Sequence, residues 1–187
     1  MGDNVPIFSI FCIDFRYDNL TANFFQGIGL VNSYFAATAA GAALPLGYKC
    51  SCSDICKKGN CNPSNEDMTL LRENLVKNLQ IALTLQPIEK VYLLNHQDCG
   101  AIKAFLGCSG YPSTLGSNNS KEIKINQDIL KYAKKYMEQK FPGKTITLGL
   151  IDINGTVAEY NILTKKWTKV FTGAGTNPLG LWFNYTF

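Results

Sequence analysis

Four short, almost unbroken apolar runs divide the chain, and longer stretches with a different periodicity separate them. A strand that is buried on both faces has this pattern, because neither of its faces meets water. The sequence therefore predicts buried strands at residues 6–13, 33–38, 91–94 and 145–151. Near the C-terminus, residues 157–163 and 167–171 flank a Thr-Lys-Lys turn and predict a β-hairpin.

Helices are predicted in the stretches between these strands. Apolar residues recur at helical spacing from Ser64 or Asn65 up to Pro87, which closes the helix. Further helices are predicted at residues 18–26, just after Gly100, and at 121–140. Because strands and helices alternate, we expect an α/β fold with a mostly parallel central sheet flanked by helices and a C-terminal hairpin. A length of 187 residues fits a single domain over residues 1–187.

The composition narrows the classes of protein. Hydrophobic residues make up 46% of the chain and charged residues 17%, so the sequence can build a core and is not disordered. The formal net charge is only +4, and the lysines of residues 121–140 read as the solvated face of an amphipathic helix. We therefore expect no nucleic-acid partner.

Residues 19–48 carry no charge, which raises the question of a membrane span. Gln26, Asn32 and Pro45 interrupt this stretch, so a buried strand flanked by loops explains it better than a bilayer helix. The first six residues include Asp3 and lead directly into a predicted strand, which is not the pattern of a secretory signal. We expect a cytoplasmic protein without a membrane segment.

Seven cysteines in a chain without a signal peptide favour metal ligation or thiol chemistry over disulfides. Four of them, Cys50, Cys52, Cys56 and Cys61, fall in a loop predicted at residues 45–65, which reads as an insertion. Four thiols so close together suffice for a second metal site, zinc or iron–sulfur, although paired Cys-x-x-Cys spacing is absent. Redox-active thiols, disulfides and plain reduced thiols remain alternatives. The loop is also predicted to leave the sheet at the carboxyl ends of its strands and to cover a pocket there as a lid.

A second group of metal-ligating residues is divided between two strands. His96, the single histidine, follows one predicted strand, and Cys99 comes three residues later. We expect both on the first turn of a helix, where that spacing turns their side chains the same way. Cys12 ends a neighbouring strand, and the carboxyl ends of parallel strands meet at one edge. Three such ligands describe a zinc site with one open position, while the alternative is two structural thiols and an ordinary buried histidine.

Two charged residues follow Cys12 at alternate positions. Asp14 and Arg16 can form an ion pair beside a metal, which keeps the carboxylate ionised and lets it orient a bound water. By themselves, however, the two residues could equally form an ordinary surface ion pair.

Taken together, these residues resemble the beta-class carbonic anhydrases. That family carries Cys-x-Asp-x-Arg after its first strand and His-x-x-Cys-Gly after a later one. Here residues 12–16 read Cys-Ile-Asp-Phe-Arg, and residues 96–100 read His-Gln-Asp-Cys-Gly. Ala40 and Gly41 resemble the family's Ala-Gly turn, and the resemblance covers roughly residues 5–155.

The resemblance implies that Cys12, His96 and Cys99 bind zinc, and that Asp14 and Arg16 form the catalytic pair. It implies the hydration of carbon dioxide to bicarbonate by hydroxide, formed on zinc because the metal lowers the pKa of its water toward about 7. It also implies a homodimer or tetramer. The predicted lining of the substrate pocket is Phe15, Ala40, Gly41 and Gly100.

Some positions depart from the family pattern and keep other functions open. Phe15 stands where most members have a small Ser, and Asn95 where Gly commonly precedes the His. A hydrolase for carbon disulfide or carbonyl sulfide uses the same zinc frame, and a silent zinc protein would have its pocket closed by Asp14 or Phe15. A phosphatase loop needs Arg at position 18, which is Asp18, while a thiol-redox enzyme depends on the cysteine loop alone.

Overall fold

A computed structural model describes residues 6–47, 65–106 and 120–173 of the chain. The strands are β1 (Ile7–Cys12), β2 (Tyr34–Ala39), β3 (Lys90–His96), β4 (Thr145–Ile151), β5 (Val157–Asn161) and β6 (Lys166–Phe171). The helices are a 3-10 turn η1 (Phe15–Tyr17) and α1 (Asp18–Gly27), α3 (Asn65–Leu85), α4 (Gly100–Leu106) and α5 (Ser120–Lys140). The predicted order of strands and helices is confirmed.

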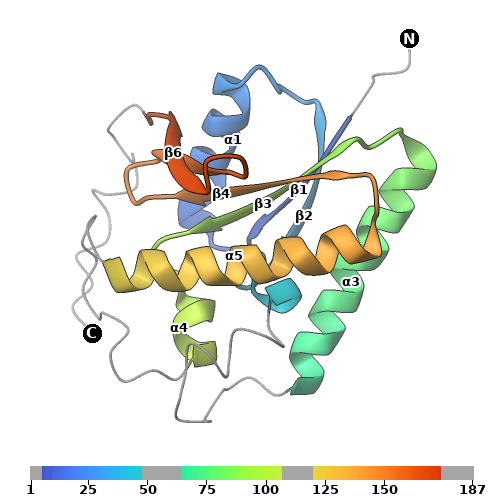
Figure 1. Cartoon of the computed structure of the whole chain (residues 1–187), viewed down its shortest axis with the longest axis horizontal. Helices are drawn as coiled ribbons and strands as arrows, with labels where there is room; N and C mark the ends of the chain where they lie inside the picture. Colours follow the sequence, from blue (N-terminus) through green and yellow to red (C-terminus); the bar gives the residue numbers. More distant parts are fainter. Residues whose placement is uncertain (1–5, 48–64, 107–119, 174–187) are drawn as a thin grey trace.

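The six strands form one mixed sheet in the order β2-β1-β3-β4-β5-β6 (Figure 1). The first four strands are parallel, and β5 and β6 add an antiparallel hairpin next to β4. This arrangement confirms the predicted α/β class with a mostly parallel sheet and a C-terminal hairpin. Because β1 and β3 are parallel neighbours, the segments that follow them leave the sheet at the same edge.

The sheet is covered on both faces, and β3 shows how the sequence achieves this. Val91 and Leu93 pack into a core cluster with residues of α3 and α5. Tyr92 and Leu94 point to the opposite face and pack with Phe24 of α1. Alternate residues of a strand face opposite sides, so a strand between two helical layers must be apolar throughout. Figure 1 shows α5 crossing one face of the sheet.

The cysteine-rich loop falls mostly outside the described residues. Cys50, Cys52, Cys56 and Cys61 belong to the undescribed range 48–64, so the second metal site, the thiol chemistry and the cover over the pocket stay predictions. Residues 45–47, which the sequence analysis placed in the loop, instead belong to a buried helical turn. Leu46 of this turn packs into the main core, which a solvated loop residue would not do.

The described part of the chain contains no helix that is both long enough and apolar enough to cross a membrane. The uncharged stretch that begins at residue 19 forms most of α1, the edge strand β2 and the turns around them.

Candidate metal centre

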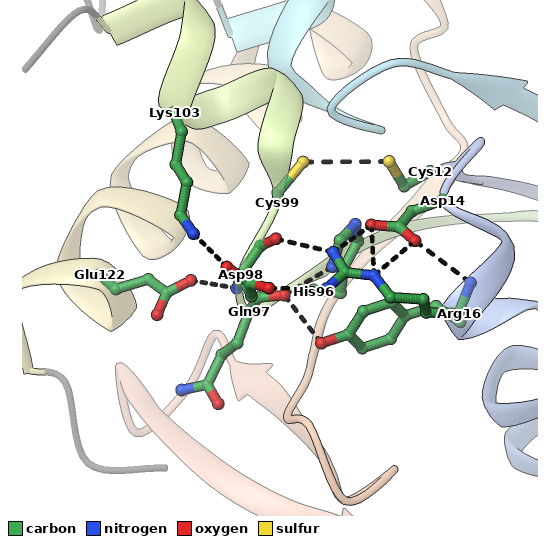
Figure 2. Close-up of polar contacts among 10 residues, drawn as sticks. Cys12, Asp14, Arg16, His96, Gln97, Asp98, Cys99, Lys103 and Glu122 are labelled. Carbon is green, nitrogen blue, oxygen red and sulfur yellow. Dashed lines mark hydrogen bonds and ion pairs between the residues drawn. The ribbon is translucent and has the colours of Figure 1, made fainter. Parts of the chain in front are cut away.

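Cys12, His96 and Cys99 come together at the carboxyl edge of the sheet. Cys12 is the last residue of β1, His96 is the last residue of β3, and Cys99 lies just before α4. One ligand atom from each residue lies within 4.8 Å of the other two, and all three side chains are buried. Figure 2 shows the three residues side by side, together with the polar residues around them.

One expectation about this group was wrong. His96 and Cys99 do not share the first turn of a helix, because β3 continues through His96, which is paired with Ile151 of β4. The chain then reverses at Asp98, whose φ of 56° lies in the left-handed region. Asp is one of the few residues that adopt this conformation at modest cost. A short turn, not helical spacing, therefore brings the two ligands together.

The ring of His96 is oriented for a metal. Its Nδ1 lies 2.6 Å from the backbone oxygen of Gln97, so Nδ1–H donates there and Nε2 keeps its lone pair. Tyr17 packs against the ring at a centroid distance of 3.9 Å and donates its own hydrogen bond to Gln97 O over 2.8 Å. Nε2 is buried, and among the residues that the structure describes it has no hydrogen-bond partner. Because a buried unpaired acceptor is costly, this atom calls for a ligand such as a metal ion.

The two sulfur atoms have a matching separation. Cys12 Sγ and Cys99 Sγ lie 3.9 Å apart, and neither residue forms a disulfide. Two sulfurs bound at about 2.3 Å to a tetrahedral zinc ion would stand roughly 3.8 Å apart. One imidazole nitrogen and two sulfurs are donors that zinc prefers. The residues present therefore fit a zinc ion.

The two thiols differ strongly in acidity. The hydrogen bond from Cys99 lowers the pKa of Cys12 to about 4, with a further contribution from His96, although burial opposes the shift. The same hydrogen bond and burial raise the pKa of Cys99 above its usual range. One thiolate is thus ready for a cation, and the second proton leaves as a metal binds.

Apolar side chains surround both sulfurs. Cys12 and Cys99 belong to a buried cluster that also contains Ala42, Leu44, Met68, Ile102, Ile125 and Ile129. Such surroundings limit the access of water and strengthen electrostatic interactions with a bound ion.

Asp14 and Arg16 form the predicted ion pair next to Cys12. Arg16 donates from Nη2 to Asp14 Oδ2 over 2.6 Å and from Nε to Oδ1 over 2.9 Å, and its backbone N–H donates to Oδ1 over 3.1 Å. Burial raises the pKa of Asp14, but these hydrogen bonds outweigh it and hold the pKa below its ordinary value. Asp14 is therefore an ionised carboxylate with a fixed orientation.

The structure adds partners that the sequence analysis missed. Arg16 also donates from Nη1 to Asp98 Oδ2 over 2.7 Å and from Nη2 to Asp98 O over 3.1 Å. Lys103 of α4 pairs with the other Asp98 oxygen, and Glu122 of α5 accepts the backbone N–H of Asp98. Asp98 could have been noticed, because it lies between the two ligands of its motif. Nothing in the sequence singles out Lys103 or Glu122.

Asn95, a departure from the family pattern, has a structural role. Its Oδ1 accepts the backbone N–H of Ala43 over 3.0 Å, and its Nδ2 donates to Asn126 Oδ1 over 3.0 Å. The buried amide thus ties the turn after β2 to β3 and α5.

The residues predicted to line a pocket lie at the same edge. Ala40 and Gly41 form the turn after β2, where Gly41 has a φ of +79° and a Cβ would come within 2.9 Å of Leu44. Gly100 begins α4, directly after Cys99. Phe15 lies in η1 and is 58% exposed. Whether these four residues contact a substrate stays a prediction.

Comparisons with known proteins agree with this architecture. No family model matches the chain. An uncharacterized protein of Rickettsia bellii is 24% identical over 150 residues, which span 80% of this chain and 78% of that protein. Rickettsia conorii has a similar protein, RC0076, with 23% identity over 150 residues, 80% of this chain and 69% of that protein.

Two solved structures share the fold. One is a tetrameric beta-carbonic anhydrase from the ascomycete Sordaria macrospora, with 14% identity, a TM-score of 0.53, and coverage of 84% of this chain and 81% of that one. The other is the beta-carbonic anhydrase CcaA, with 16% identity, a TM-score of 0.52, and coverage of 90% of this chain and 85% of that one. The chain therefore has the fold of the beta-carbonic anhydrases, as the sequence motifs predicted.

Proposed function

We propose that this protein is a zinc-dependent carbonic anhydrase that interconverts carbon dioxide and bicarbonate. The observation that carries the proposal is the unpartnered Nε2 of buried His96, which meets the sulfurs of Cys12 and Cys99 beside an ionised Asp14. The shared fold supports the same reading. Three donors leave one position open, the arrangement of catalytic and not of structural zinc sites.

Each ligand residue has a defined task. Cys12 and Cys99 supply negative charge, and His96 supplies a neutral nitrogen whose tautomer is set by Gln97 O. Cys12, His96 and Cys99 would hold the zinc ion, which would lower the pKa of water and so supply hydroxide near neutral pH. Tyr17 keeps the imidazole plane in place by packing against it.

Asp14 is the residue that orients the attacking group. Oδ1 accepts both Nε–H and the backbone N–H of Arg16, whereas Oδ2 accepts Nη2–H over 2.6 Å and only a longer 3.2 Å share of Nε–H. We therefore assign Oδ2 to the O–H at the open position. An ionised carboxylate accepts such a bond and favours one orientation of the nucleophile. Asp14 can do so only while it stays ionised and held by Arg16.

The apolar cluster around the sulfurs suits an uncharged substrate. Carbon dioxide is uncharged and loses little hydration beside an apolar cluster of this kind, whereas a bicarbonate anion is poorly solvated there. The same surroundings therefore favour entry of the substrate and departure of the product.

The proposal includes a homo-oligomer, a dimer or tetramer, in the cytoplasm. Ile13 and Phe15 flank Asp14 and are 61% and 58% exposed, so apolar surface lies directly beside the candidate site. A second copy of the chain would cover it. Light scattering coupled to gel filtration measures the assembly, and a monomer at micromolar concentration would remove this part of the proposal.

Stopped-flow hydration of carbon dioxide at pH 7 and pH 8.5, on protein whose zinc is counted by elemental analysis, tests the proposal. Cys12→Ser is expected to lose the zinc and the activity together. Asp14→Ala is expected to keep zinc and lose most of the activity, while Asp128→Ala on the outer face of α5 serves as its matched control.

One outcome would contradict the assigned substrate. If the protein binds one zinc per chain but gives no rate above buffer at either pH, carbon dioxide is not the substrate. Release of hydrogen sulfide from carbon disulfide or carbonyl sulfide would then identify a hydrolase on the same residues. No rate with any of the three would leave a zinc protein without this chemistry.

A further inference from the structure

Arg16 is shared by two carboxylates, and it uses different nitrogens for each. Nε and Nη2 bind Asp14, while Nη1 binds Asp98 Oδ2 over 2.7 Å. Nη2 also donates to the backbone oxygen of Asp98 over 3.1 Å. Because the guanidinium is planar and rigid, partners on two of its edges fix both its position and its plane.

Asp98 is unusual for a charged residue. Its side chain is only 8% exposed, and its backbone adopts a φ of 56°. Ionised groups are rarely buried unless they are paired, and Asp98 is paired on both oxygens, with Arg16 on one and Lys103 on the other. Its backbone N–H donates a hydrogen bond to the buried carboxylate of Glu122. Three separate elements therefore hold this one residue.

Asp98 connects these contacts to the candidate zinc ligands. Asp98 lies in the turn between His96 and Cys99, two of the three candidate zinc ligands. Figure 2 shows the hydrogen bonds running from Asp98 through Arg16 to Asp14. Through Arg16, these bonds fix the orientation of Asp14 relative to the turn between His96 and Cys99, and not only relative to β1.

We propose that Asp98, supported by Lys103, is a positioning residue that holds Arg16, and through Arg16 the Asp14 carboxylate, in register with the metal ligands. This inference rests on the proposed function for its effect on activity, but its structural part can be tested independently. Without the Asp98 carboxylate, Arg16 loses the charged partner of Nη1 and keeps the longer Nη2 bond to the backbone oxygen of residue 98. The Arg16–Asp14 pair then moves more easily relative to His96 and Cys99. Outer partners of this kind typically change activity about 10–100-fold.

Four variants test the proposal. Asp98→Asn keeps the shape of the side chain but removes the charge that binds Arg16 and Lys103. Lys103→Met removes the support of Asp98 and is the second test if Asp98→Asn fails to fold. Lys103→Arg keeps a cation in that place and should restore the wild-type behaviour. Asp128→Asn, an acid paired with Lys124 on α5, is the matched control.

The first readout is the hydration rate per bound zinc. For Asp98→Asn we expect one zinc per chain and a kcat/KM per zinc about 10–100-fold below wild type. Lys103→Met should show a smaller loss in the same direction, whereas Lys103→Arg and Asp128→Asn should stay within about twofold of wild type. A loss of zinc and rate in equal proportion would overturn the proposal, because Asp98 would then act only on metal retention or folding.

The second readout does not depend on activity. The chain has two arginines, Arg16 and Arg72, so a nitrogen-15 NMR spectrum contains two Nε–H signals, which Arg72→Lys assigns. Arg72 donates its Nε–H to Pro45 O and is an internal reference. The Arg16 Nε–H itself binds Asp14, and it exchanges only when the guanidinium moves away from that carboxylate. In Asp98→Asn this opening no longer has to break the charged Nη1 bond to Asp98, so exchange of the Arg16 Nε–H should become roughly tenfold faster, while Arg72 does not change.

The two readouts separate this inference from the proposed function. If the wild type shows no hydration activity, faster exchange of Arg16 in Asp98→Asn still supports the positioning role, and unchanged exchange overturns it. If the wild type is active, a rate per zinc and an Arg16 exchange rate both within twofold of wild type in Asp98→Asn would overturn it.

Discussion

The carboxyl edge of the sheet and the outer face of α5 use the same kinds of charged residue in different ways. At the edge, the Asp98 side chain is 8% exposed and every oxygen of Asp14 and Asp98 has a cationic partner. On α5, Lys124 is 66% exposed and pairs with Asp128 one helical turn away. Both regions contain ion pairs, but only the first buries a paired carboxylate, that of Asp98, where little water can replace a missing partner.

The difference shows how to separate charges that position a site from charges that are merely solvated. A solvated pair can lose one member with little effect, because water screens and hydrates the other. A buried carboxylate left without its cation keeps a large desolvation cost. Substitutions at the carboxyl edge of the sheet should therefore lower the free energy of unfolding most, and substitutions on the outer face of α5 should lower it least.

Arg16→Met should have the largest effect on stability. It leaves Asp14 without its cation and Asp98 with Lys103 alone, and we expect the free energy of unfolding to fall by about 2–3 kcal/mol. Urea unfolding at pH 7 measures it. Arg72→Met, at the only other arginine, is the control and should cost less, since in the described part of the chain Arg72 forms one hydrogen bond, to the neutral Pro45 O, and packs on Tyr136. An Arg16→Met loss no greater than that of a surface lysine would erase the contrast between the two regions.

Asn95→Leu should come next. It leaves the backbone N–H of Ala43 and the Oδ1 of Asn126 without partners in the core, which costs about 2 kcal/mol. Thermal unfolding with and without added zinc measures the loss in both metal states. Asn78→Leu, at an exposed position of α3, is the matched control and should stay within about 0.5 kcal/mol of wild type. Equal losses in the two variants would mean that the Asn95 bonds contribute nothing.

Glu159 on β5 is half-buried, between the buried edge and the exposed face of α5, and it makes the stability of the fold depend on pH. Burial raises the pKa of Glu159 in the folded protein, although Lys90 and a hydrogen bond with Tyr92 oppose the shift. Ionisation is thus easier in the unfolded chain, so stability falls as pH rises from below about 4.3 through the raised folded pKa. Glu159→Gln should remove this fall and be relatively more stable at pH 7 than at pH 4, by about 1 kcal/mol or less.

Urea titrations of Glu159→Gln and wild type at pH 4 and pH 7 provide the comparison, with exposed Glu89→Gln as the control. A stability difference between wild type and Glu159→Gln that does not change with pH would contradict the assigned cause.

Lys124→Met should have the smallest effect. The exposed pair with Asp128 contributes about 0.3–0.5 kcal/mol at low ionic strength. Unfolding in low salt and in 1 M salt should show this difference shrinking, because the Debye screening length falls to about 3 Å at 1 M salt. A loss of unfolding free energy above about 1 kcal/mol would contradict this, because the exposed charges of α5 would then stabilise the fold as much as buried ones.

Most of the secondary structure could be predicted because its signal is local. Ile7–Cys12 and Thr145–Ile151 are apolar throughout, and the spacing of Leu75 and Leu79 repeats along α3. The residues at which strands end were predicted less accurately. The strand predicted to end at Leu94 continues to His96, since pairing with β4 extends it beyond its apolar part.

The clustering of Cys12, His96 and Cys99 was also predictable, but the local geometry of this candidate metal centre was not. Histidine and cysteine are few enough in the chain that their spacing stands out, and they were matched to the ends of parallel strands. The turn at Asp98 was missed, because a left-handed residue between a strand and a helix leaves no periodic trace in the sequence. Helical spacing was the simpler assumption and it was wrong.

The sequence by itself determined which segments become strands or helices, their order, and which three side chains come together as a candidate metal centre. Those properties depend on residues a few positions apart, so a single chain displays them. Only the tertiary structure decided that Arg16 meets Asp98, 82 positions away, and that Glu122 of α5 accepts the Asp98 N–H. These contacts depend on strand pairing and helix docking, which bring distant residues together without any local pattern that marks them.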